Sequence, residues 1–393
     1  MPHLPDHQRN VRYAASSRTW FLTMGLGAII LLCVLAYAFG YSSVFGVDYY
    51  AGTYAQGVAI IRPPVLDKDA YDLKLLQVAY ATTTISTSTI AAFAATSTNS
   101  TPSTGSGQAS SPQTAANPRP LWPVKTAYPN YGALLPFNRI VAYYGNFLST
   151  RMGALGEYPA DEMLQKLEGE VANWEAADPS TPVIPAIHYI AVTAQASAGA
   201  DGKYRARMSD NQIDHALELA ARVHGIVFLD IQVGLSDLSS EVPQLENYLK
   251  LPQVHLAIDP EFAMQPSGMK PGSVVGTYDA RNINYAANYL ANLVRQYHLP
   301  PKILIIHRYT QAMVTNYKEI SPLPEVQIVM HMDGWGEPAK KIGTYTFFIQ
   351  SEPVQFTGFK VFYKNDIRPP STRLLTPKEI LQLKPQPLYI QYQ

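Results

Sequence analysis

From about residue 119 to the C-terminus, short apolar runs alternate with stretches of helical periodicity, and this alternation restricts the fold more than any other feature. Strands that alternate with helical patterns are typical of parallel sheets with helical crossovers. The eight strand-like runs lie at residues 139–144, 182–190, 226–232, 254–259, 303–307, 326–332, 358–363 and 387–392. Eight such units are typical of one barrel of roughly 250 residues. We therefore predict an α/β fold, a (β/α)8 TIM-like barrel, for residues 119–393.

An open doubly wound sheet is the alternative arrangement of the same elements. That fold usually carries a glycine-rich phosphate turn after its first strand, and no such turn follows residues 139–144. Helices are expected at residues 159–177, 209–223, 280–297 and 376–383. The last of these begins with Thr376 and Pro377, an N-cap followed by proline at the first helical position. The run at 273–277 is interpreted as a loop.

The N-terminal part of the chain contains 22 residues without a charge, at positions 20–41. About 20 apolar residues suffice to cross a bilayer as a helix. Arg9, Arg12 and Arg18 precede the stretch, so the positive-inside rule predicts a cytoplasmic tail at 1–19. We expect a single-pass signal-anchor in the cell membrane, with the C-terminal domain extracytoplasmic. A signal peptide cleaved after Ala38 is the alternative.

Two segments separate the predicted anchor from the predicted barrel. Residues 42–81 form a juxtamembrane segment, for which the sequence suggests at most a short helix. Residues 82–118 form a linker rich in Ser and Thr, which make up 18 of the 35 residues from 82 to 116. Such a composition buries too little apolar area to offset the entropy of ordering. We therefore predict a disordered stalk here.

The charge balance and the cysteine content exclude several classes of protein. The chain has 30 Lys and Arg against 30 Asp and Glu, and no basic cluster, so a nucleic-acid partner is not expected. Its one cysteine, Cys33, permits neither an intrachain disulfide nor a cysteine-rich metal site. Neither a P-loop nor a nucleophile elbow is present, and no cofactor is expected.

Polar residues in the strand-like runs share one register. Phe228, Asp230 and Gln232 share one face of their run, while the intervening apolar residues take the opposite face. The same register, continued into the following loops, contains His188, His255, Asp259, Glu261, His307, Gln327, His331, Asp333, Lys360 and Gln391. Barrel active sites lie at the C-terminal ends of the strands, where most of these residues fall. The pattern therefore predicts a polar pocket at that end of the barrel.

Some of these residues are expected to serve the fold rather than a site. His255 and Gln327 lie deep in their runs, so we expect them to be hydrogen-bonded core residues. Asp259 precedes Pro260, and shaping a turn is the alternative to a role in the pocket.

Several carboxylates around one pocket suit the hydrolysis of glycosides, which needs one protonated and one ionised carboxyl group. Crowded carboxyl groups push one another's pKa values apart and so supply both forms. We expect Glu261 to be the catalytic acid, with Asp333 or Asp230 as its partner. The residues expected to bind the substrate are Asp259, His188, His307, His331, Trp335, Tyr144 and Lys360. No metal ligands are assigned.

Motifs at the strand ends resemble those of a known group of proteins. The segments FLDIQVG (228–234), AIDPEF (257–262) and HMDGWG (331–336) resemble exported bacterial barrel proteins distantly related to glycoside hydrolases. The opening of the domain at residues 143–158 is similar to a group of uncharacterised secreted or lipoprotein-like bacterial proteins. The resemblance covers residues 138–393 and implies an exported barrel. It includes no catalytic signature of the hydrolases, so the reaction rests on the carboxylates.

The predicted function is that of a membrane-anchored extracytoplasmic hydrolase acting on an envelope or environmental glycan, either a polysaccharide or peptidoglycan. Two other classes stay open. A non-catalytic envelope protein would bind a glycan or a partner through the same pocket. A metal-dependent hydrolase would use the His and Asp side chains as ligands. However, residues 143–146 lack the H-x-H pair found on the first strand of amidohydrolase-like barrels.

Overall fold

The computed structural model describes residues 65–81 and 120–393. The predicted cytoplasmic tail, the membrane anchor at 20–41 and the linker at 82–118 lie outside the described residues. Within those described ranges, no helix combines the length and apolar character needed to cross a membrane.

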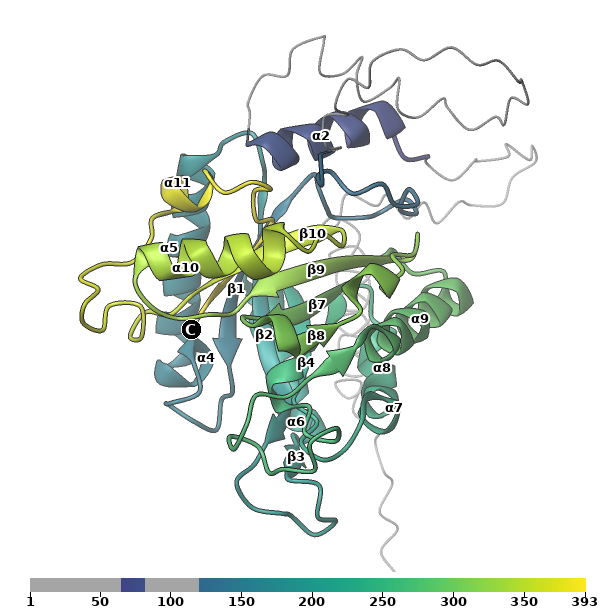
Figure 1. Cartoon of the computed structure of the whole chain (residues 1–393), viewed down its shortest axis with the longest axis vertical. Helices are drawn as coiled ribbons and strands as arrows, with labels where there is room; N and C mark the ends of the chain where they lie inside the picture. Colours follow the sequence, from purple (N-terminus) through teal and green to yellow (C-terminus); the bar gives the residue numbers. More distant parts are fainter. Residues whose placement is uncertain (1–64, 82–119) are drawn as a thin grey trace, which may run out of the picture. The chain divides into compact units, whose positions relative to one another are not determined.

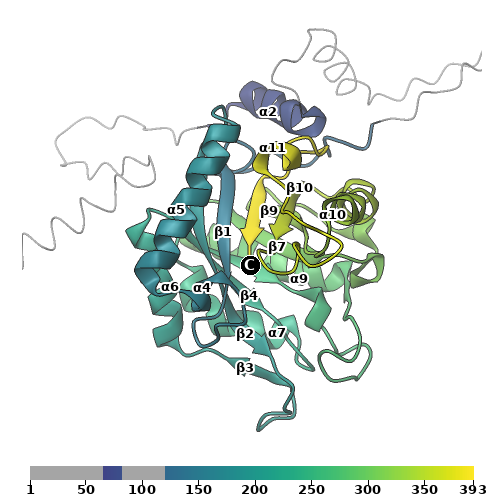
Figure 2. The ribbon, with the colours of Figure 1, turned by 90° about the vertical axis from the view of Figure 1, so that its left-hand side faces the viewer.

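Eight parallel strands in the described part of the chain close into a barrel with helices around it (Figures 1 and 2). They are β1 (Arg139–Gly145), β2 (Val183–Ala194), β4 (Ile226–Ile231), β5 (Val254–Ile258), β7 (Lys302–Arg308), β9 (Val326–Met332), β10 (Phe356–Val361) and β11 (Tyr389–Tyr392). The barrel closes because β1 pairs with both β2 and β11. The predicted (β/α)8 architecture is confirmed, and each strand overlaps one of the eight predicted runs.

Three further short strands lie outside the set of eight barrel strands. Strand β2 continues four residues past its predicted end at Ile190, because its last part pairs with the antiparallel strand β3 (Arg205–Arg207). Strands β6 (Tyr278–Asp279) and β8 (Val314–Thr315) pair with each other in the loops that follow β5 and β7.

Three long helices agree with the predicted ones to within one residue at each end. They are α5 (Ala160–Ala177), α6 (Asp210–Arg222) and α9 (Ala280–Tyr297). Each has a stripe of buried apolar side chains against the strands, which is the periodicity visible in the sequence. The predicted helix at 376–383 is shorter than expected: α11 (Pro377–Ile380) is a single turn held by a capping box between Thr376 and Glu379.

Several short helices were missed, because none is long enough to show a clear apolar period. They are α4 (Ala154–Glu157), α7 (Leu238–Glu241), η1 (Val242–Leu245), α8 (Glu246–Leu249), η2 (Pro260–Phe262) and α10 (Pro338–Tyr345), which continues into the π-helix η5 (Thr346–Gln350). The crossover from β7 to β9, described throughout, contains the 3-10 turns η3 (Gln311–Met313) and η4 (Tyr317–Glu319) in place of an α-helix.

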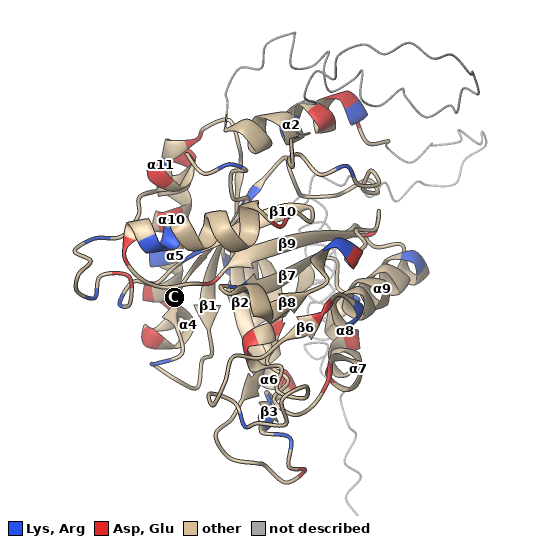
Figure 3. Cartoon of the chain, in the orientation of Figure 1, with Lys and Arg blue, Asp and Glu red and all other residues tan. Residues whose placement is uncertain are grey.

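The side chains of each strand divide between two cores, as the shared register predicts. Val227, Leu229 and Ile231 of β4 pack in the layer between strands and helices, whereas Ile226 and Phe228 face the barrel interior. Figure 3 shows the strands largely free of charged residues, which lie mainly on helices, loops and strand ends. The half of the interior toward the N-terminal ends of the strands, called the lower half below, contains an apolar cluster. Its members include Ile140, Ala142, Ala186, Ile226, Phe228, Ala257, Ile303, Ile305, Val329 and Phe356.

Helix α2 (Lys68–Tyr80) covers the N-terminal end of the barrel. Asp67 caps the helix, and Tyr71 and Val78 join the interior core. Lys74 Nζ donates to Thr181 Oγ1 at 2.8 Å, just before β2 begins. The helix lies within the segment for which the sequence suggested at most a short helix.

The segment before β1 also closes this end. The side-chain amide of Gln327 accepts from the backbone N–H of Leu135 at 3.1 Å and donates to its carbonyl at 2.6 Å. His255 Nδ1 accepts from the N–H of Ile303 at 3.1 Å. The structural roles predicted for His255 and Gln327 are therefore confirmed.

Candidate active site

A cavity of about 450 Å³ opens at the C-terminal ends of the strands. Six residues predicted for the site line it: Tyr144, Asp259, Glu261, Asp333, Trp335 and Lys360. The parallel strands bring them together because each follows, or lies near, the C-terminal end of its strand. The remaining walls combine aromatic, aliphatic and polar residues, with Phe262, Tyr309 and Phe362 among them.

Four other predicted site residues lie beneath the cavity instead of lining it. His188, Asp230, His307 and His331 are fully buried. Their depth follows from their place in the strands: Asp230 lies inside β4, whereas Asp259 and Asp333 follow the last residues of β5 and β9. The structure thus buries the three histidines that were predicted to bind the substrate, and also Asp230, which was predicted as a possible catalytic partner of Glu261.

Tyr144 lies between the cavity and the buried residues beneath it. Its hydroxyl donates to Asp230 Oδ2 at 3.2 Å and accepts from Gln232 Nε2 at 3.2 Å. Lys360 Nζ lies 3.9 Å from the centre of the Tyr144 ring, a cation–π contact. The ring of Tyr144 therefore forms the floor of the cavity above Asp230.

Asp333 is held in its ionised form. His307 Nδ1 lies 2.8 Å from Asp333 Oδ2, and Lys360 Nζ lies 3.0 Å from Oδ1. Burial raises the pKa of Asp333, but the Lys360 ammonium and the His307 ring outweigh burial and lower this pKa below its ordinary range. Asp333 therefore presents a carboxylate to the cavity.

Asp259 and Glu261, in contrast to Asp333, favour the protonated form. Burial raises the pKa of Asp259 well above its ordinary value, and burial together with the charge of Asp333 raises the pKa of Glu261. Asp259 also accepts from the backbone N–H of Glu261 at 3.0 Å, which caps η2 and fixes the turn after β5. Asp259 therefore shapes the turn and lines the cavity at once, and the two alternatives for it are not exclusive.

The cavity thus combines neutral and ionised carboxyl groups at close range. One oxygen of Asp259, one oxygen of Asp333 and one ring nitrogen of His307 lie within 4.8 Å of one another. Glu261 is in addition hydrogen-bonded to Tyr309, a residue that the sequence did not suggest because it lies in the loop after β7, beyond the strand periodicity. Trp335 stands at the rim, 46% exposed, with Lys340 Nζ 4.8 Å from its ring centre.

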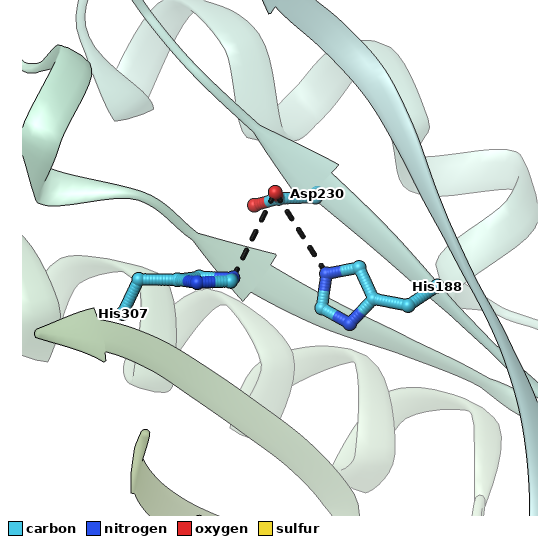
Figure 4. Close-up of side chains that lie close together, drawn as sticks. All are labelled: His188, Asp230 and His307. Carbon is cyan, nitrogen blue, oxygen red and sulfur yellow. Dashed lines mark ion pairs between the residues drawn. The ribbon is translucent and has the colours of Figure 1, made fainter. Parts of the chain in front are cut away.

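The buried layer contains a compact group made of His188, Asp230 and His307 (Figure 4). The Nε2 atoms of both imidazoles lie 3.8 Å from Asp230 Oδ2. Burial lowers the pKa of His188 to about 4. Burial also disfavours a charged His307, but Asp230 and Asp333 overcome it and raise the pKa of His307. These three residues could hold a metal ion, as could the set of Asp259, His307 and Asp333, although the sequence assigned no metal ligands.

Comparisons with known proteins give distant matches among solved structures. No family model matches the chain, and no curated protein matches it. Among solved structures, a GH18 chitinase from Pseudoalteromonas aurantia is similar with 13% identity and a TM-score of 0.34, over 65% of this chain and 94% of the other. Thermotoga maritima Cel5A in complex with cellobiose gives 10% identity and a TM-score of 0.34, over 65% and 89%. A ruminal GH26 endo-β-1,4-mannanase gives 12% identity and a TM-score of 0.32, over 65% and 59%.

At these identities and TM-scores, the similar structures carry no weight for the activity of this chain. The barrel and the arrangement of its cavity stand on the strand pairing and the side-chain geometry described above.

Proposed function

We propose that the chain is a carbohydrate-active hydrolase that cleaves glycosidic bonds with a pair of carboxyl groups. One observation carries the proposal: a single open cavity presents an ionised Asp333 beside Glu261, whose pKa is raised. Glycoside hydrolysis requires this pair, because one carboxyl group must protonate the leaving oxygen while the other acts as nucleophile or base.

Glu261 is the proposed acid. It lies on η2 at the cavity wall and is only partly buried, so its carboxyl group is accessible to a ligand. Asp333 is the proposed nucleophile or base. Of the two partners that the sequence allowed, Asp333 is preferred, because Asp230 is fully buried behind Tyr144.

His307 below the cavity and Lys360 in its wall support the role of Asp333. His307 donates from Nδ1 to Asp333, and Lys360 pairs with the other carboxylate oxygen. Both are positioning residues in this proposal, because they hold the carboxylate in place and in its charged form. Asp259, close by and neutral, is a hydrogen-bond donor for a substrate hydroxyl.

The walls of the cavity fit a sugar chain. Trp335 at the rim, together with the lining residues Phe262 and Tyr309, offers flat apolar faces, while the carboxyl groups offer hydrogen bonds. Apolar and aromatic residues with a few convergent polar groups are the usual composition of a small-molecule site. The proposed substrate is therefore a glycan of the cell envelope or the surroundings.

The test is release of reducing ends from a panel of polysaccharides and peptidoglycan by the purified full-length chain in detergent. We expect Glu261→Gln and Asp333→Asn each to lower the rate by about 10²–10⁴-fold, which is the usual contribution of a positioned acid or base. Glu175→Gln is the matched control, because Glu175 is exposed on α5 away from the cavity. Hydrolysis that survives in both cavity variants, with unchanged thermal unfolding, would contradict the assignment.

Glycan or partner binding without catalysis is the second candidate, and one observation favours it. Both oxygens of Asp333 already have cationic or hydrogen-bonding neighbours, and the residue is only 8% exposed. A protein of this kind would bind oligosaccharides without releasing reducing ends. Glu261→Gln would leave its dissociation constant nearly unchanged, whereas Trp335→Ala would weaken binding.

We also propose that residues 20–41 hold the barrel outside the cell. The support is the uncharged 22-residue stretch, with three arginines before it. Protease added to intact cells should then digest the barrel domain, and the chain should fractionate with membranes. N-terminal sequencing of the mature protein separates an anchor from a signal peptide cleaved after Ala38.

A further inference from the structure

We propose that His188, Asp230 and His307 bind a divalent first-row transition-metal ion inside the barrel, one layer below the cavity. This proposal does not rest on the hydrolase proposal, since it concerns groups that do not line the cavity. It follows from the geometry of three fully buried side chains that point toward one another from β2, β4 and β7 (Figure 4).

The distances suit a shared ion rather than direct hydrogen bonds. Each Nε2 atom lies 3.8 Å from Asp230 Oδ2, which is too long for a hydrogen bond. The three ligand atoms lie within 4.8 Å of one another. Ligands at about 2.0–2.1 Å around a tetrahedral ion stand about 3.3 Å apart, so small side-chain movements bring this group to a coordinating geometry.

Several polar atoms of this group are also unpartnered, although Asp230 Oδ2 accepts from the Tyr144 hydroxyl. Among the described residues, no hydrogen-bond partner is present for His188 Nε2, His307 Nε2 or Asp230 Oδ1. Buried polar atoms are nearly always satisfied, so three unsatisfied atoms on these three neighbouring side chains call for a ligand. Two histidines and one carboxylate form the set found at open Zn²⁺ and Fe²⁺ sites.

The surroundings of the two imidazoles match those of metal ligands, whose second ring nitrogen is usually held by an outer partner. His307 Nδ1 is held by the Asp333 carboxylate at 2.8 Å. His188 Nδ1 contacts the Tyr389 hydroxyl and the side-chain amide of Gln391. Rotation of that amide turns its Oε1, which has no partner among the described residues, toward the Nδ1 proton.

The local charge favours a cation once both imidazoles are neutral, as metal ligation requires. Asp230 and Asp333 are carboxylates, and Lys360 is the ammonium group that interacts with both. With neutral imidazoles, these three groups sum to one negative formal charge before any contribution from Asp259. The alternative set of Asp259, His307 and Asp333 is less suitable, because Asp333 is already paired with Lys360 and His307. An ion in the proposed site would fix His307 and, through it, the carboxylate of Asp333.

The experiment uses the full-length chain, purified in detergent without a histidine tag and stripped with a chelator. Co²⁺ alone is then titrated, and visible d–d absorption is recorded together with the metal content by mass spectrometry. We expect about one tightly bound Co²⁺ per chain, displacement by Zn²⁺, and a higher unfolding temperature with either ion, because binding to the folded state stabilises it. Absence of the absorption in the wild-type chain overturns the proposal.

Variants locate the ion. Asp230→Asn keeps the size of the side chain and a partner for the Tyr144 hydroxyl, so it should fold, and His188→Asn removes a second ligand. Both are expected to lower Co²⁺ affinity by at least about 100-fold, more than loss of an outer partner costs. His331→Leu, at a position equally buried but outside the group, should bind Co²⁺ as the wild type does. A Co²⁺ spectrum that persists in both ligand variants shows binding elsewhere and also overturns the proposal.

Discussion

The two halves of the barrel interior are built from the same strands but from different chemistry. The N-terminal half is filled by aliphatic and aromatic side chains and closed by α2 and by Leu135. The C-terminal half contains three buried histidines, several carboxyl groups and Lys360. In the lower half, hydrogen bonds satisfy Gln327, and the Tyr71 hydroxyl is buried without a partner among the described residues. In the upper half, unpartnered atoms occur on His188, Asp230, His307 and His331.

The lower half therefore stabilises the fold, whereas the upper half contains the candidate functional groups. Apolar burial of the lower half stabilises the fold, at about 25 cal/mol per Å² of buried apolar surface. Buried ionisable groups oppose folding unless they are paired. Their concentration at one end, next to the cavity, is typical of a functional site rather than of a core.

The largest expected effect lies in the lower half. Ile303→Ala removes a fully buried side chain from the interior core and should lower the free energy of unfolding by about 2–5 kcal/mol. Denaturant unfolding of the full-length chain measures it. Ile342→Ala, on α10 and 38% exposed, is the control and should change stability by less than about 0.5 kcal/mol. Equal losses in the two variants would mean that the interior is not packed as described.

A matched change in the upper half should act in the opposite direction. Both ring nitrogens of His331 are buried without a partner among the described residues, so His331→Leu removes an unsatisfied polar group. We expect the free energy of unfolding to stay level or to rise by up to about 1–3 kcal/mol. A loss as large as that of Ile303→Ala would show that His331 is satisfied by a group such as an internal water and belongs to the stabilising core.

The smallest expected effect concerns Asp259 and depends on pH. Its folded-state pKa is raised by burial, so its favourable contribution is fully present below the unfolded pKa and is lost as pH rises through the folded pKa. Asp259→Asn keeps the cap of η2 and should therefore be slightly more stable than the wild type at neutral pH, with the difference vanishing in acid. Thermal unfolding at both pH values tests this. A strong loss of stability at every pH would mean that the variant breaks the turn.

The sequence was sufficient for the barrel and for the face on which its polar residues lie. Strand alternation is local, so Asp230 and Asp333 could both be placed inside from their neighbours alone. Their depth could not be predicted, because it depends on the register between strands that are distant in sequence, such as His307 opposite His331. For the same reason, the sequence predicted Asp230 as part of the pocket wall, whereas the structure buries it between two histidines.

The positions of residues outside the strand pattern could not be predicted from the sequence either. Tyr309 enters the cavity from a loop, where no periodicity constrains its position. Helix α2 contributes Tyr71 and Val78 to the barrel interior, although it is separated from β1 by a long segment without a folding signal of its own. Such contacts are set by tertiary packing rather than by local sequence.

The pH dependence of hydrolysis tests most directly whether neutral and ionised carboxyl groups work side by side. We expect a bell-shaped profile of kcat/KM on the substrate found by the reducing-end screen. The acid limb should report the lowered pKa of Asp333, and the alkaline limb should lie above the ordinary range of glutamate because the pKa of Glu261 is raised. The alkaline limb should disappear in Glu261→Gln. A profile without an alkaline limb in the wild type, or one unchanged in Glu261→Gln, would contradict the pairing of Glu261 with Asp333.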